Sequence, residues 1–111
     1  MTVNDIINSN IGKVIYTSNN LDRVIEKPFC CDLLSLAMSK ASSTCAWVTV
    51  MGDVNTLAVA SLAEVPLLIL CEGVTFDELA LDRAREVDIC IIYTDLSIFE
   101  AALKVYNIVH G

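Results

Sequence analysis

The polar residues best placed to bind a ligand come directly after three apolar segments of the chain, 46–51, 65–71 and 88–93. Continuously apolar segments of this length are typical of parallel strands that are covered on both faces. The carboxyl ends of such strands meet at one edge of the sheet, where ligands of α/β proteins bind close to helix N-termini. The candidate ligand-binding residues at this edge are Gly52, Asp53, Asn55, Gly73, Thr94 and Ser97.

The loops at this edge offer backbone amides and hydroxyls, but they also carry the acids Asp53, Glu72 and Asp95. These carboxylates would repel a phosphate unless a metal ion or a basic group intervened. An alternative interpretation is purely structural: Thr75, Thr94 and Asp95 cap helices, and the glycines turn the chain. The sequence leaves both interpretations open.

No recognisable catalytic constellation is present in the sequence. The glycines are isolated, so neither the G-x-x-x-x-G-K-[ST] loop nor the G-x-G-x-x-G loop exists. The only histidine, His110, lies next to the C-terminus, where nothing orients it against a serine or cysteine nucleophile. Zinc sites need about four Cys or His ligands, and the sequence shows no such set, because its only histidine lies next to the C-terminus. We therefore expect a protein that is not an enzyme and that holds no metal and no resident cofactor.

The five cysteines are an odd number, and none is spaced C-x-x-C, so structural disulfides are not expected. Cys30 and Cys71 are the thiols to consider for redox chemistry, and Cys71 is the better candidate because it ends an apolar segment beside a turn. The neighbouring Glu72 would raise the pKa of Cys71 rather than lower it. We expect the cysteines to act mainly as small hydrophobic residues.

Strands and helices alternate along the chain. We expect strands at about 13–16, 24–31, 46–51, 65–71 and 88–93, and helices at about 2–9, 33–39, 54–64 and after the turns at 72–75 and 94–95. This order predicts an α/β fold, a three-layer Rossmann-like domain with a mainly parallel sheet of about five strands and helices on both faces. Pro28 cannot donate to a neighbouring strand, which places its segment on an edge or at a bulge. Residues 1–111 are expected to form one domain.

Side-chain caps predict where several helices begin. Thr2 and Asp5 have the spacing of a capping box, and Asp32 is expected to cap the helix that follows it. Either Thr94 or Asp95 is expected to cap the last helix. The residues of that helix expected to point inward are Phe99, Ala102, Leu103 and Tyr106.

The helix at 54–64 has apolar or small residues on nearly every side, which is typical of a helix that is buried all round. One face would pack on the sheet, and the other would suit a symmetry-related helix in a two-fold homodimer. The candidate interface residues are Leu57, Ala58, Ser61 and Leu62. Alternatively, the first or last helix of the same chain covers this face.

The composition excludes several classes of partner. The 111 residues carry a formal net charge of −7, which argues against nucleic-acid binding and against an anionic membrane surface. Apolar segments are too short to span a bilayer, and the N-terminal residues lack the pattern of a signal peptide. We therefore expect a cytoplasmic protein with no membrane association.

The order of several short strings resembles the DRTGG domain family. The strings are 2–7 (TVNDII), 21–23 (LDR), 32–35 (DLLS), 46–50 (AWVTV) and 94–102 (TDLSIFEAA). Of the family's naming motif, Asp22 and Arg23 remain, whereas Glu26, Lys27 and Pro28 stand in place of its threonine and two glycines. Lys27 and Pro28 would alter any close approach of the backbone to a ligand there.

The resemblance implies a domain similar to the non-catalytic N-terminal domain of HPr kinase/phosphorylase, without the P-loop domain that carries kinase activity. It implies a regulatory or ligand-sensing module, with an adenine nucleotide as the candidate ligand. Asp22 and Arg23 are the first candidates for function, because a guanidinium facing the cleft could bind a phosphate in a bidentate manner. Alternatively, the two residues form a structural ion pair.

A different class of function is also open. Stand-alone members of the family are similar to proteins encoded near iron-only hydrogenase components, which implies an accessory subunit that docks on a redox enzyme or an HPr-like partner. A ligand sensor predicts a concave, partly polar pocket between strand ends. A docking subunit predicts an exposed apolar patch instead.

Overall fold

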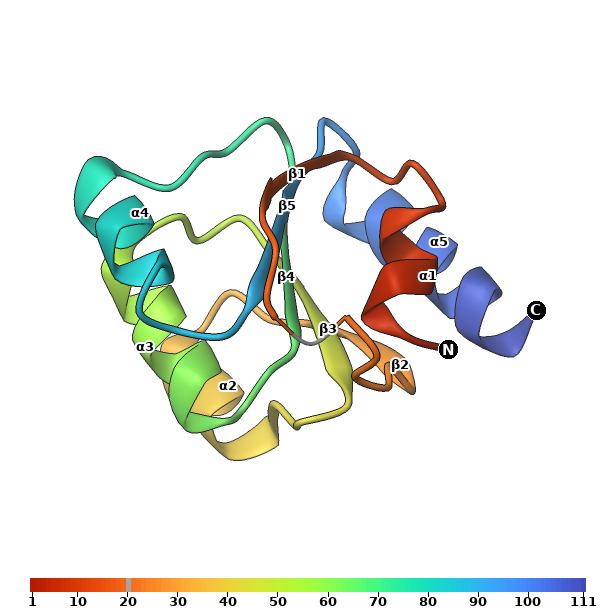
Figure 1. Cartoon of the computed structure of the whole chain (residues 1–111), viewed down its shortest axis with the longest axis horizontal. Helices are drawn as coiled ribbons and strands as arrows, with labels where there is room; N and C mark the ends of the chain where they lie inside the picture. Colours follow the sequence, from red (N-terminus) through yellow and green to blue (C-terminus); the bar gives the residue numbers. More distant parts are fainter. Residues whose placement is uncertain (20) are drawn as a thin grey trace.

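The computed structural model describes residues 1–19 and 21–111, and it shows a sheet between two layers of helices (Figure 1). The strands are β1 (Lys13–Tyr16), β2 (Lys27–Cys30), β3 (Cys45–Thr49), β4 (Leu67–Leu70) and β5 (Cys90–Tyr93). The helices are α1 (Val3–Ile7), α2 (Leu34–Lys40), α3 (Val54–Leu62), α4 (Glu78–Ala84) and α5 (Ile98–His110). The predicted α/β fold with a five-stranded, mainly parallel sheet is confirmed.

The strand order is β1-β5-β4-β3-β2. Strands β2 to β5 are parallel, and β1 runs antiparallel to β5. β2 stands last in this order, next to β3, and therefore forms an edge, as Pro28 predicts. Because β1 is reversed, its first residue lies at the edge where the parallel strands end.

The central strands explain why the apolar segments do not alternate with polar residues. Every residue of β3 and β4 is buried, because helices cover both faces of the sheet. α2, α3 and α4 lie on one face over a core that includes Trp47 and Leu68, whereas α1 and α5 cover Val48 and Ile69 on the other (Figure 1). No helix in the described part of the chain is long and apolar enough to cross a membrane.

Two predicted caps have different outcomes at α1 and α2. The Thr2–Asp5 capping box is confirmed at the start of α1. The prediction that Asp32 caps α2 is wrong, since α2 begins after Leu33 without a side-chain cap. The Asp32 carboxylate instead accepts hydrogen bonds from the Thr49 hydroxyl at 2.6 Å and from the Val50 backbone N–H at 3.0 Å. The Thr49 side chain is buried and needs an acceptor, which Asp32 supplies across the β2–β3 pair.

The cap of α5 also differs from the prediction. Ser97, rather than Thr94 or Asp95, begins the helix and forms a capping box with Glu100. The Thr94 hydroxyl lies ahead of the helix, where it accepts from the Leu96 N–H at 3.2 Å and donates to the Ile11 carbonyl at 2.8 Å. The bond to Ile11 ties the end of β5 to the loop before β1.

The predicted inward face of α5 is wrong for its three largest residues. Phe99, Leu103 and Tyr106 are 71%, 45% and 50% exposed, whereas Ala101 and Val105 are buried. The helix carries two apolar stripes at helical spacing, and the stripe with smaller side chains faces the sheet. Small residues allow α5 to pack closely over β2 and β3, with which it makes contact.

Candidate functional site

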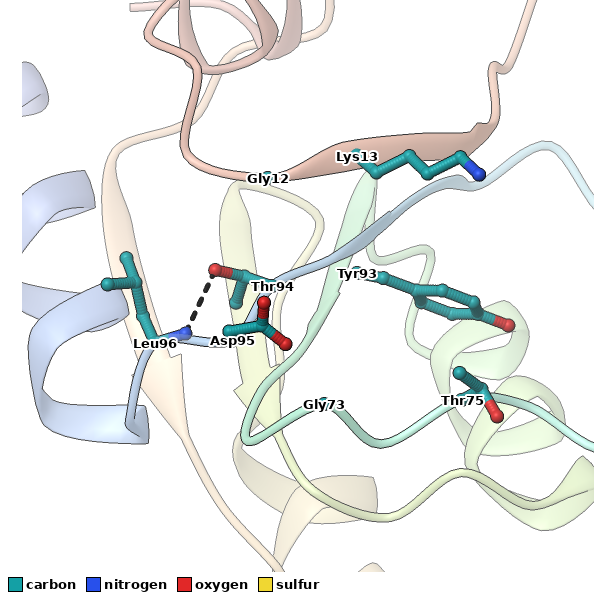
Figure 2. Close-up of a pocket in the computed structure, with 8 residues that line it drawn as sticks. All are labelled: Gly12, Lys13, Gly73, Thr75, Tyr93, Thr94, Asp95 and Leu96. Atoms are coloured by element: carbon teal, nitrogen blue, oxygen red, sulfur yellow. Dashed lines mark hydrogen bonds between the residues drawn. The ribbon is translucent and has the colours of Figure 1, made fainter.

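A cleft opens at the carboxyl ends of the parallel strands, beside the start of β1 (Figure 2). Its volume of about 480 Å³ is within the range of small-molecule sites. The walls of this carboxyl-edge cleft come from β1, from the end of β5 and from the loop between β4 and α4. The lining residues are Gly12, Lys13, Gly73, Thr75, Tyr93, Thr94, Asp95 and Leu96.

The antiparallel pairing of β1 with β5 places Lys13 at this cleft, opposite Tyr93. The pairing requires glycine at position 12, because a Cβ there would lie 2.2 Å from the Tyr93 carbonyl oxygen. Sequence reasoning did not select Lys13 as a site residue. Its role depends on which strand β1 joins and in which direction, and the local pattern of residues 13–16 gives neither.

The loop after β4 forms another wall and is held by main-chain hydrogen bonds. The Gly73 N–H donates to the Thr94 carbonyl at 3.1 Å, and the Glu72 N–H donates to the Leu96 carbonyl at 2.9 Å. Both Glu72 and Gly73 have positive φ, a conformation that glycine adopts without steric cost. The structure thus brings together Gly73 and Thr94, two of the predicted site residues.

Thr94 contributes to the wall of the cleft, but its hydroxyl is already hydrogen-bonded within the protein. Its side chain is buried, and its hydroxyl donates to the Ile11 carbonyl while accepting from the Leu96 N–H at 3.2 Å. The side chains of Lys13, Thr75 and Asp95 differ in this respect. Within residues 1–19 and 21–111, they make no hydrogen bond or ion pair with other protein groups. These three side chains can therefore interact with a ligand without breaking a contact of the fold.

The Tyr93 hydroxyl can donate a hydrogen bond to a ligand in the same cleft. Its phenolic oxygen accepts from the Phe76 backbone N–H at 2.9 Å, which leaves its O–H available as a donor. Figure 2 shows the Lys13 and Tyr93 side chains extending in the same direction, with Thr75 beyond the Tyr93 ring and Asp95 on the opposite side, near Gly73. The cleft thus has a donor-rich end and a carboxylate at the other end.

Four further predicted site residues do not line this cleft. Gly52 packs against the loop that forms the wall, since a Cβ there would lie 2.5 Å from the Thr75 carbonyl oxygen. Asp53 caps α3 by accepting from the Thr56 N–H at 3.0 Å, and Asn55 is exposed in the first turn of that helix. Ser97 caps α5. Asp53 and Ser97 are thus helix caps, whereas the structural interpretation assigned the caps to Thr75, Thr94 and Asp95; α4 is capped by Asp77.

Arg23 lies at the opposite end of the sheet. Its guanidinium donates to the main-chain carbonyls of Glu64, just after α3, and of Asp88, just before β5, the latter at 3.4 Å. Arg23 lines a separate cavity of about 360 Å³, together with Ser61, Val65 and Ile89. Strands of four residues span roughly 13 Å at 3.3 Å per residue, so Arg23 does not reach the carboxyl-edge cleft. Its neighbour Asp22 is exposed.

The thiols lack the properties of reactive cysteines. Cys71 is buried, and desolvation, together with the nearby Cys30, Glu72 and Asp32, raises its pKa to about 12. Cys30 is exposed, but its pKa is also raised, mainly by desolvation and further by Asp32. Thiolates are therefore scarce at neutral pH at both sites. In the described part of the chain, no group of three or more Cys, His, Asp or Glu side chains is arranged to hold a metal ion.

The predicted dimer face on α3 is only partly accessible. Leu57 is 1% exposed, whereas Ala58 and Ser61 are exposed and Leu62 is 74% exposed. A groove of about 370 Å³ runs between α3 and α4, with Leu57 among the residues that line it. On α4, Leu79 adds a second exposed apolar side chain to the groove.

Neither a scan against models of protein families nor a search of curated proteins finds a match to this sequence. The DRTGG resemblance therefore stays a prediction. The features of the molecule that bear on function are the carboxyl-edge cleft and the exposed apolar faces of α3, α4 and α5.

Proposed function

We propose that this protein is a non-catalytic ligand sensor that binds a small organic anion in the carboxyl-edge cleft and acts as a homodimer. Adenine nucleotides are the first ligands to test. The observation that carries the proposal is the presence of Lys13, without a protein partner among the described residues, in a cleft that also offers the Tyr93 and Thr75 hydroxyls. Together these groups form a donor set for an oxyanion.

Lys13 supplies the positive charge that an anionic ligand needs beside the acidic residues at this edge of the sheet. The protein carries a formal net charge of −7, and Asp95 lies in the cleft itself, so an anion needs a local cation to bind. Among residues 1–19 and 21–111, Lys13 is the only basic residue that lines the cleft. Its removal should therefore affect binding far more than removal of a distant lysine.

A sensory role also agrees with the connection between the cleft and α4. The loop that carries Gly73 and Thr75 leads directly into α4, which begins at Glu78 and forms the apolar groove with α3. A ligand that contacts this loop would bias the position of α4 and hence the proposed dimer face. Regulation through the loop and α4 requires that the ligand bind with different affinities to the two positions of α4.

The test is a thermal-shift screen with AMP, ADP, ATP, cyclic dinucleotides, diadenosine polyphosphates and NAD(H). Selective binding to the native state raises the free energy of unfolding by about 2.7 kcal/mol at a hundredfold excess over Kd. We expect Lys13→Gln to remove the shift and Lys40→Gln, on the exposed end of α2, to retain it. The absence of a shift with every compound, or equal shifts in the two variants, would contradict the proposal.

A second candidate function is supported by the outer stripe of α5. Phe99, Leu103 and Tyr106 form an exposed apolar surface, which is the feature expected of a subunit that docks on a redox enzyme or an HPr-like partner without a small ligand. A pull-down with the wild-type protein and with Leu103→Ser tests this candidate. Capture of a partner that survives Leu103→Ser would contradict docking through α5.

A further inference from the structure

We infer that the ligand of the carboxyl-edge cleft is a sugar phosphate with a single phosphate group and vicinal hydroxyls, as in a nucleoside monophosphate, rather than a polyphosphate. This inference rests on the proposed function, because it names the chemistry of the ligand at the same site. It follows from the polarity of the two ends of the cleft and from the number of its charges.

The donor end of the cleft offers an oxyanion one cation and two hydroxyl groups. Lys13, Tyr93 and Thr75 all line the cleft, and Figure 2 shows the Lys13 and Thr75 side chains on opposite sides of the Tyr93 ring. The Tyr93 oxygen already accepts from Phe76 N–H, so its proton is available for a ligand oxygen. The ammonium offers a phosphate oxygen a charge-assisted hydrogen bond, and the Tyr93 O–H offers a neutral one.

The acceptor end of the cleft selects a ligand that donates. Asp95 lines the cleft next to Gly73, where a Cβ would lie 3.4 Å from the Asp95 Oδ1 atom. Its carboxylate has no hydrogen-bond donor from the protein within the described residues. An ionised carboxylate can accept two hydrogen bonds, which vicinal hydroxyls supply. A simple anion would only be repelled by it.

The charge count sets the number of phosphate groups. Lys13 and Asp95 both line the cleft, yet no ion pair joins them in the part of the chain that the structure describes, so each charge is available to the ligand. A single cation is a poor match for the three or four negative charges of a nucleoside triphosphate, particularly in a protein with a net charge of −7. A monophosphate leaves much less uncompensated charge.

Titration calorimetry without Mg²⁺ tests the inference with AMP, ATP and 2′,3′-dideoxy-AMP. We expect AMP to bind about tenfold more tightly than either of the others, which corresponds to about 1.4 kcal/mol. Asp95→Asn tests whether the Asp95 carboxylate strengthens or weakens AMP binding. If Asp95 accepts from the ligand hydroxyls, this variant weakens AMP binding about tenfold and does not weaken binding of dideoxy-AMP. If Asp95 only repels the phosphate, it tightens the binding of both.

The control is Asp82→Asn, which removes the same charge from the exposed face of α4 and should leave every affinity within about twofold. Tighter AMP binding in Asp95→Asn, equal binding of dideoxy-AMP, or preference for ATP would overturn the inference while the sensor proposal stands. If none of the three compounds binds to the wild-type protein or shifts its melting temperature, both the inference and the adenine-nucleotide sensor are overturned.

Discussion

At the scale of single residues, two cations of this chain have different surroundings and hence different expected roles. The Arg23 guanidinium donates to two main-chain carbonyls, whereas the Lys13 ammonium has no protein partner among the described residues. The surviving Asp-Arg motif favoured Arg23 as the ligand-binding residue. The sequence could not show that main-chain carbonyls of Glu64 and Asp88, far along the chain, meet this side chain.

Replacing Arg23 should lower stability rather than ligand affinity. The guanidinium joins the end of α3 to the segment before β5, and hydrogen bonds from charged donors contribute about 1.5–3 kcal/mol. Because Arg23 is partly exposed, we expect Arg23→Ala to lower the free energy of unfolding by about 1–2 kcal/mol in urea titrations. Arg85→Ala, which removes an exposed arginine at the end of α4, serves as the matched control and should change it by less than about 0.5 kcal/mol. Equal losses in the two variants would exclude the structural role of Arg23.

The buried thiols predict a loss of stability at alkaline pH. Desolvation raises the pKa of Cys71 to about 12 and that of Cys90 to about 11, above the ordinary thiol value of 9.0. The unfolded chain therefore releases these protons first, so the free energy of unfolding is fully retained below about pH 9 and falls as the pH rises toward 11. Urea titrations at pH 8 and pH 10.5, under reducing conditions, measure this fall. We expect a smaller fall in Cys71→Ala/Cys90→Ala, and an identical fall in the wild-type protein and the variant would refute the thiol contribution.

At the scale of elements, the three continuously apolar segments predicted β3, β4 and β5 well, because burial on both faces leaves a continuous apolar pattern. Helix caps were predicted less well. Asp32 is of the right type to cap a helix, but α2 begins one residue later, with Leu33 at the N-cap position, and the Asp32 carboxylate accepts from the buried Thr49 hydroxyl. On α5 the periodicity was correctly helical, but two apolar stripes satisfied it, and only the packing distance to the sheet decides between them.

Asp32 should consequently matter for the sheet and not for α2. Asp32→Ala leaves the buried Thr49 hydroxyl without this acceptor, which costs about 1–3 kcal/mol. Asp32→Asn keeps an acceptor oxygen and should recover most of this loss in thermal or urea unfolding. If instead Asp32→Asn and Asp32→Ala are equally destabilised, the hydrogen bond to Thr49 is not the reason for the effect.

At the scale of the whole molecule, the sequence predicted the layers and the parallel sheet but not the position of β1. A reversed strand at the edge beside β5 brings Lys13 next to the loops after β4 and β5. This arrangement depends on contacts between residues about 80 positions apart, as in the Thr94–Ile11 hydrogen bond. Local patterns therefore located one side of the cleft, with Gly73 and Thr94, and missed the cation on the other side.

The exposed faces give a prediction about assembly. Leu62 is exposed beside the α3–α4 groove, and Phe99 is exposed on the other face of the sheet, on α5. If α3 forms the dimer, Leu62→Asp should yield monomers in sedimentation velocity experiments, because it places a charge in the apolar contact. Phe99→Asp should leave the dimer intact. A wild-type monomer at micromolar concentrations, or dissociation only in Phe99→Asp, would contradict this assignment of the interface.

The most direct test of the central claim is a titration of ¹⁵N-labelled protein with AMP, followed through backbone amide chemical shifts. Binding in the carboxyl-edge cleft predicts saturable shifts concentrated at residues 12–13, 73–75 and 93–96, which surround it, and their loss in Lys13→Gln. Amides beside Arg23, at the other end of the sheet, should not move. Shifts confined to the surroundings of Arg23, or no shifts at millimolar AMP, would contradict the assignment of this cleft as a nucleotide-sensing site.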